Sequence, residues 1–170
     1  MGRQSRKITA AALQTGVWLS SQMAAYAGAF NEPNTATASG TNAIAIGEAA
    51  SASGSNATAI GTLANASANN AMALGTSSIA DAINALAEGV GAIASANNSI
   101  AIGVSAEATG PNSTAVGANS LSSGSNATSL GAASSSNGNN SLAIGTTAAA
   151  SGTNATAVGT GASAANTNAI

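Results

Sequence analysis

The sequence predicts an all-β protein, a parallel β-solenoid built from coils of 14 residues. Three observations predict this fold class. From Ser39 onward the chain divides into 14-residue units without insertion or deletion. Each full unit carries Asn at its fourth position and Gly at its ninth. Between these two positions small residues alternate with larger apolar or threonine residues, and an alternation with period two indicates a β-strand.

The composition by itself is also compatible with a disordered chain. Most of the 45% hydrophobic content is alanine. Leu, Ile, Val and Phe together make up roughly 15% of the sequence, below the ~20% at which a packed core becomes doubtful. Disordered chains usually combine low hydrophobicity with high net charge. Because the net charge here is only −2 and the repeat is strict, we expect a folded chain of one domain.

The inventory of charged and metal-binding residues excludes several functions. Cys and His are absent, which excludes disulfides, the usual zinc and haem sites and a His-dependent triad. The three basic residues are Arg3, Arg6 and Lys7, and only acidic residues follow them. A chain without a base beyond residue 7 cannot neutralise phosphates. We therefore expect no nucleic-acid partner and no cofactor, and the isolated carboxylates indicate no enzyme.

The first 27 residues have the three-part pattern of a secretory signal peptide. A basic stretch precedes a moderately apolar one at 8–19, and small residues then lead to Ala25-Tyr26-Ala27. We expect cleavage after Ala27, with 28–38 as a lead-in to the repeats at 39–170. The alternative is an amphipathic N-terminal helix that stays attached. The apolar stretch is too short to span a ~30 Å bilayer core with ease, so we expect no membrane insertion.

The repeat comprises nine full units, from 39–52 to 151–164, and a partial unit at 165–170. Positions 5, 7, 12 and 14 of each full unit are Ala or Ser, and position 8 is Ile, Leu or Val in eight of the nine. Helix is disfavoured, because Gly costs about 1 kcal/mol relative to Ala at a helical position and β-branched residues recur at positions 6 and 8. Each unit is therefore expected to contain strand, turn, strand and turn.

The two expected strands differ in their faces. The first covers positions 4 to 8 and has small residues on one face and larger ones on the other. The second covers positions 11 to 14, where positions 12 and 14 are small and positions 11 and 13 vary as solvated positions do. The simplest packing brings the small faces together, at less than the usual ~10 Å sheet spacing.

The larger side chains of the first strand then point away from the coil. A long apolar stripe left in water marks an interaction surface, so we expect it to be buried by self-association in a rotationally symmetric oligomer. The predicted interface comprises Ile44, Ile46, Ile60, Leu74, Ile100, Ile102, Val116, Leu130, Leu142, Ile144 and Val158.

The invariant Asn and Gly are expected to be structural. Asn tolerates left-handed backbone and bonds to local backbone, Gly takes positive φ without steric cost, and stacked Asn side chains can form a ladder. A ligand-binding role is disfavoured because a site is rarely repeated at every coil. The expected turn ladders are Asn42, Asn56, Asn70, Asn84, Asn98, Asn112, Asn126, Asn140, Asn154 and Asn168, and Gly47, Gly61, Gly75, Gly89, Gly103, Gly117, Gly131, Gly145 and Gly159.

Four stretches carry a specific resemblance: NAIAIG (42–47), NATAIG (56–61), NSIAIG (98–103) and NSLAIG (140–145). They resemble the repeated N-S-V-A-I-G motif in the heads of trimeric autotransporter adhesins of the YadA type. The resemblance covers 39–170 and implies a left-handed parallel β-roll, a homotrimer, and a head that attaches bacteria to extracellular matrix or other surfaces. It also implies export to the cell surface and attachment to the outer membrane.

The sequence departs from that family in two respects. It contains no coiled-coil heptads, neck or C-terminal barrel anchor, so we expect it to be part of a longer adhesin. In the fourth unit (81–94), Glu88 replaces the aliphatic residue at position 8. One reading is that three such carboxylates meet in a trimer as an ion or pH-sensing site. We favour the other, in which the unit is locally distorted and Glu88 reaches water.

Two further functions remain as alternatives to adhesion. Flat solenoids that carry Thr can order water, as in ice binding, but Thr at position 6 is intermittent here. A phage fibre or similar trimeric spike would share the fold, but the expected signal peptide argues against it.

Overall fold

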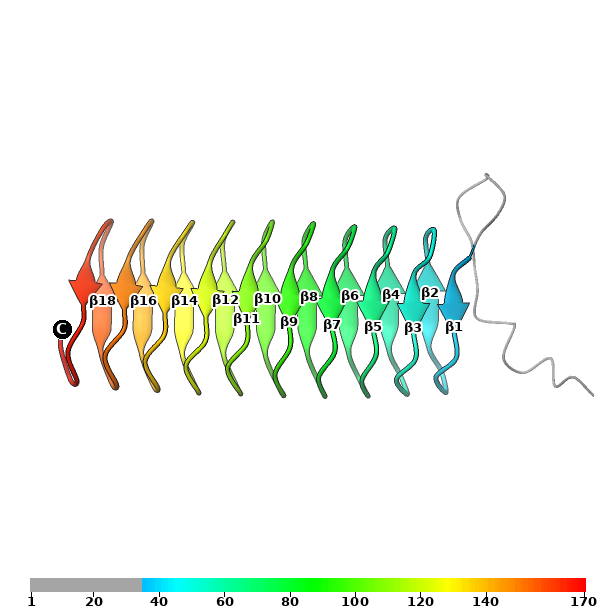
Figure 1. The fold of residues 1–170 in the computed structure, drawn as a ribbon, viewed down its shortest axis with the longest axis horizontal. Helices are drawn as coiled ribbons and strands as arrows, with labels where there is room; N and C mark the ends of the chain where they lie inside the picture. The colour runs from blue at the N-terminus through cyan, green and yellow to red at the C-terminus, as the bar shows by residue number, and fades with distance from the viewer. Residues whose placement is uncertain (1–34) are drawn as a thin grey trace, which may run out of the picture.

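The computed structural model describes residues 35–170, which form one stack of β-coils. Figure 1 shows the coils side by side along the longest axis of the molecule, with β1 near one end and the C-terminus at the other. The predicted signal peptide and most of the predicted lead-in lie outside the described residues. Every element among the described residues is a strand, a turn or a bend.

Each full coil contributes one strand of three residues and one of two. The three-residue strands are β2 Ile44–Ile46, β4 Thr58–Ile60, β6 Met72–Leu74, β8 Leu86–Glu88, β10 Ile100–Ile102, β12 Thr114–Val116, β14 Thr128–Leu130, β16 Leu142–Ile144 and β18 Thr156–Val158. The two-residue strands are β1 Thr37–Ala38, β3 Ser51–Ala52, β5 Asn65–Ala66, β7 Ile79–Ala80, β9 Ile93–Ala94, β11 Glu107–Ala108, β13 Leu121–Ser122, β15 Ser135–Ser136, β17 Ala149–Ala150 and β19 Ser163–Ala164.

The strands form two parallel sheets that run the length of the stack. The odd-numbered strands make a 10-stranded sheet and the even-numbered strands a 9-stranded one, each in the order of the coils. Every strand pairs with the strand one coil away, so that Ile44 lies beside Thr58 and Ile100 beside Thr114. The predicted all-β parallel solenoid with 14-residue coils is confirmed.

The strands are shorter than the sequence predicts, because each turn extends two residues further into the strand that follows it. Positions 4 and 11 have left-handed backbone, with φ of 58° at Asn98 and 60° at Leu63. In each case the residue is the third of a β-turn. The N–H of Ala57 closes one turn on the carbonyl of Gly54 at 3.2 Å, and the N–H of Ala64 closes the other on that of Gly61 at 3.1 Å. Extended backbone therefore remains only at positions 6 to 8 and 13 to 14.

Position 11 takes this conformation even where the residue is unsuited to it. Leu63 and Thr147 have φ of 60° and 57°, although left-handed backbone costs an ordinary residue roughly 1–2 kcal/mol. The preceding coil supports the conformation. The Leu63 N–H donates to the Glu48 carbonyl at 2.8 Å, and the Thr147 N–H to the Ala132 carbonyl at 2.9 Å.

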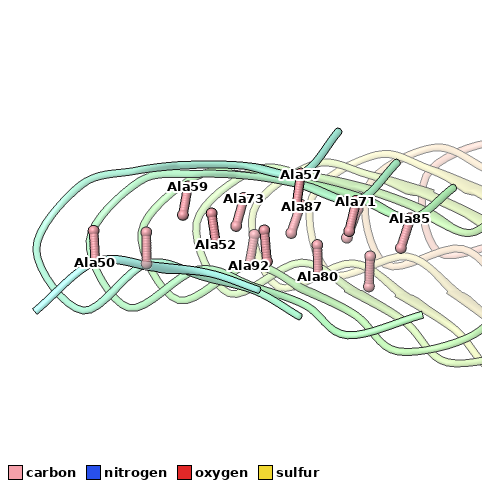
Figure 2. Close-up of a cluster of buried hydrophobic side chains, with 14 of the residues drawn as sticks. Ala50, Ala52, Ala57, Ala59, Ala71, Ala73, Ala80, Ala85, Ala87 and Ala92 are labelled. Atoms are coloured by element: carbon pink, nitrogen blue, oxygen red, sulfur yellow. The ribbon is translucent and has the colours of Figure 1, made fainter. Parts of the chain in front are cut away.

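The core between the sheets consists of alanine and serine. The alanines at positions 5, 7, 12 and 14 are almost all buried, with Ala59, Ala66 and Ala101 fully so. Figure 2 shows alanine side chains such as Ala59 and Ala80 pointing from the two walls of the coil toward one another. The expectation that the small faces of the two strands meet is confirmed.

Serines replace alanine in this core mainly in the C-terminal half, and most find a hydrogen-bond partner. The hydroxyl of Ser120 donates to the Gly117 carbonyl at 2.8 Å, and Ser136 and Ser141 share a bond of 2.6 Å. Two others differ: the hydroxyls of Ser113 and Ser122 are buried without a partner among the described residues.

The stack begins before the first repeat that the sequence defines. β1 precedes Ser39 and pairs with β3, with Thr37 beside Ser51 and Ala38 beside Ala52. These two residues occupy positions 13 and 14 of a preceding coil. The lead-in therefore contributes a strand to the ten-stranded sheet.

The glycines at position 9 allow a close approach between coils. Gly103 has φ of 132°, and a Cβ added to it would lie 2.6 Å from the Gly117 oxygen and 2.7 Å from its carbonyl carbon. Gly91, at position 11, has φ of 65°, but an added Cβ would meet only the Ser105 hydroxyl, at 3.7 Å. Glycine is required at Gly103 both for the close stacking of the next coil and for the positive φ. At Gly91 it is required for neither, since other residues adopt the same φ at position 11.

Replacing these glycines tests that distinction. We expect Gly103→Ala to destabilise the fold by more than about 2 kcal/mol, because the methyl group would collide with backbone that cannot move away. Gly91→Ala should cost about 1 kcal/mol, the strain of one left-handed alanine. Thermal or chemical unfolding followed by circular dichroism measures both. Equal effects would show that φ, and not the approach of the next coil, governs position 9.

The two classes of buried serine should respond oppositely to alanine. Ser122→Ala removes a hydroxyl without a partner and should be neutral or stabilise by up to about 1 kcal/mol. Ser120→Ala loses a made hydrogen bond and should destabilise by about 1 kcal/mol. Unfolding midpoints of the two variants provide the comparison. A loss of stability at Ser122 matching that at Ser120 would contradict the assignment.

Candidate functional site

The candidate site is the outward face of the nine-stranded sheet. In each three-residue strand the middle residue, at position 7, is buried, while positions 6 and 8 on either side remain accessible. Parallel pairing in register places each of these residues beside its equivalent in the next coil, about 4.8 Å away. The side chains therefore form two continuous rows along the stack, which we call the aliphatic rows.

The structure places every residue of the predicted interface in these rows. The exposed fraction of the side chain is 44% at Ile44 and 63% at Val158. The other residues of the predicted interface are exposed or half-buried. Met72 and Leu86 also belong to the rows, at position 6 of the third and fourth units. The predicted interface omitted these two residues, although the position rule that defined it includes them.

One charge interrupts the aliphatic rows. Glu88 is exposed at the end of β8 and lies in register between Leu74 and Ile102. β8 keeps the same pairing as its neighbours, so the local distortion expected for this unit is absent from its strand register. Residues 35–170 contain no Lys, Arg or His, so this carboxylate has no basic partner there.

The asparagines at position 4 form a continuous hydrogen-bonded ladder on one edge of the stack. Each side-chain amide donates to the carboxamide oxygen of the Asn one coil further on. The distance is 2.9 Å from Asn84 to Asn98 and 3.0 Å from Asn98 to Asn112. The remaining links extend the ladder from Asn42 to Asn168. Each of these side chains therefore hydrogen-bonds to at least one other asparagine of the ladder.

A family model for the YadA head domain repeat matches residues 38–64, 66–92, 94–120, 122–148 and 150–170. The matches cover more than half of the chain. The chain belongs to the YadA head family. No curated protein sequence matches it closely enough to count as a relative. The repeat structure of this YadA head accounts for the aliphatic rows and the Asn ladder, since each recurs once per coil.

A second, partial set of asparagines in this YadA head was not predicted. At position 3, the carboxamide oxygens of Asn69, Asn97 and Asn139 accept backbone N–H groups from the preceding coil at 3.1–3.2 Å. The sequence signal was Asn at position 3 in three of the nine full units, too intermittent to stand out. These bonds reinforce the edge that also carries the Asn ladder.

Residues 35–170 hold no cluster of three or more acidic side chains that could bind a metal ion. The same part of the chain also lacks any helix with the length and apolar character needed to cross a bilayer. The most regular accessible surface of residues 35–170 is the extended pair of aliphatic rows.

Substitutions at Asn98 should separate the two roles of the ladder asparagines. Asn98→Gly keeps the left-handed backbone but removes two ladder bonds, and should destabilise by about 1–2 kcal/mol. Asn98→Ala should cost about 1 kcal/mol more, because alanine is strained at φ of 58°. Unfolding curves of both variants test this. Glycine and alanine variants of equal stability would mean that backbone strain contributes nothing.

Proposed function

We propose that this chain is the head of a trimeric bacterial surface adhesin, in which three copies pack through their aliphatic rows. The observation that carries this proposal is the run of outward Ile, Leu, Val, Met and Thr side chains along the nine-stranded sheet, interrupted once, at Glu88. Membership of the YadA head family supports the trimer and the adhesin class.

The physical argument concerns where the large apolar side chains can be buried. The interior accepts only alanine and serine, so Ile and Leu at positions 6 and 8 can leave water only against another chain. Burying one such side chain contributes about 1.5–3 kcal/mol. Because the same surface occurs on every copy and extends along the whole stack, a closed ring of parallel chains buries it without leaving a free end.

The biological role that follows is attachment without catalysis. The chain would be exported by the signal peptide at 1–27 and displayed at the cell surface, joined to the outer membrane through parts of a longer adhesin. Its partners would be extracellular matrix protein or an abiotic surface. The described surface carries four carboxylates and no base, which disfavours anionic partners such as nucleic acids.

Sedimentation equilibrium on the purified chain, with far-UV circular dichroism of the same sample, tests the assembly. A β-rich trimer is the expected result. A soluble, β-rich monomer would overturn the proposal, because it would show that the aliphatic rows tolerate water. A disordered monomer would show that a single chain does not fold without neighbouring segments to hold three copies together.

Removing the one charge in the rows should strengthen the trimer. We expect Glu88→Leu to stabilise the assembly by about 1–3 kcal/mol per chain, because a carboxylate without a partner is replaced by a buried aliphatic side chain. Glu107→Leu is the matched control, since Glu107 lies at position 13 of the other sheet. Dissociation and melting of the trimer measure both variants. A stabilisation that is equal in the two variants would place the interface elsewhere.

A further inference from the structure

The outward row of the ten-stranded sheet changes character in the middle of the stack. Position 13 supplies this row, and its neighbour at position 14 is buried in every strand. Near both ends the row is small or polar: Thr37, Ser51 and Asn65 on one side, and Ser135, Ala149 and Ser163 on the other. Between them the residues are Ile79, Ile93, Glu107 and Leu121.

These four side chains are immediate neighbours. Ile79 pairs in register with Ile93, Ile93 with Glu107, and Glu107 with Leu121. With about 4.8 Å between strands they span roughly 14 Å. Asp81 is exposed directly after β7, beside the first of them. We call Ile79, Asp81, Ile93, Glu107 and Leu121 the outer-face patch.

The fold does not require apolar residues in the outer-face patch. The other coils form the same strand and the same pairing with Ser, Asn or Ala at position 13. The hydrophobic core is made by the alanines and serines on the opposite face of this strand, so Ile93 and Leu121 add nothing to it. Ile79, Ile93 and Leu121 are half-buried, and adjacent large aliphatic side chains in a row that is otherwise small or polar mark an interaction surface.

The charges of the patch restrict the partner. Asp81 and Glu107 have no basic residue to pair with anywhere in 35–170. They repel nucleic acids and anionic membranes and attract cationic side chains. Because Glu107 lies between Ile93 and Leu121, a complementary partner has a basic side chain between apolar ones.

We propose that the outer-face patch binds a protein segment in which Lys or Arg is flanked by aliphatic side chains. This inference rests on the proposed function in one respect: the trimer occupies the aliphatic rows and leaves the ten-stranded sheet facing outward. It adds to that function a location for the partner, the third to sixth units, and a chemical class for it.

The test uses the full chain and a fluorescein-labelled peptide with two Leu-Lys-Val triplets separated by Gly-Ser. Fluorescence anisotropy should detect binding that weakens with added salt. A peptide with Glu for Lys, and one with Ser for Leu and Val, should bind at least about tenfold more weakly. Equal binding of the Glu peptide would overturn the proposal.

Variants locate the binding on the patch. Ile93→Ser should weaken binding of the Lys peptide by about tenfold or more, and Glu107→Gln should lower both the affinity and its salt dependence. Ala149→Ser, at the same position outside the patch, should leave binding unchanged. If Ile93→Ser lowers the circular dichroism signal, Leu121→Ser replaces it. Equal affinities of the patch variants and Ala149→Ser would overturn the proposal.

Sedimentation of the same samples separates this proposal from the proposed function. A wild-type trimer that does not bind the Lys peptide overturns the patch and leaves the trimer standing. A wild-type monomer that shows the expected pattern of binding overturns the trimer and supports the patch, which is present on each single chain.

Discussion

The narrow space between the two sheets is the constraint on which the rest of this structure depends. Only alanine and serine fill it, as at Ala59 and Ser136, so every larger apolar side chain must lie outside the coil. A methyl group buries little area, and the interior therefore contributes less per residue than a conventional core. Stability must come from elsewhere: one source lies within the chain, and the proposed trimer would add a second.

The first source is hydrogen bonding between coils. Each turn is supported by the coil before it, through backbone bonds such as Leu63 to Glu48 and through the Asn ladder. These bonds connect each coil only to its neighbours, so stability should accumulate along the stack as in other repeat proteins. The second source belongs to the proposed trimer: burial of the aliphatic rows between copies would make folding and assembly depend on each other.

Because the coils repeat, features that occur in only a few coils can be compared with the coils that lack them. A feature present in every coil, such as the Asn ladder, is explained by stacking. A feature confined to a few coils needs another explanation, because the remaining coils fold without it. Glu88 in the aliphatic rows and the run from Ile79 to Leu121 on the opposite sheet both depart from the repeat, and they lie within the same four units. The middle of the stack is therefore the part that differs most from a uniform scaffold.

The sequence by itself determined the coil length, the parallel stacking, the alanine and serine interior and the outward direction of positions 6 and 8, because each follows from a strict period and from strand alternation. Only the tertiary structure decided the rest. The left-handed backbone of Leu63 and Thr147, the short strands, the bonds made by Asn69 and the lack of a partner at Ser122 all depend on the residue stacked one coil away. Local propensity carries no information about that neighbour, whereas packing and hydrogen bonding between coils do.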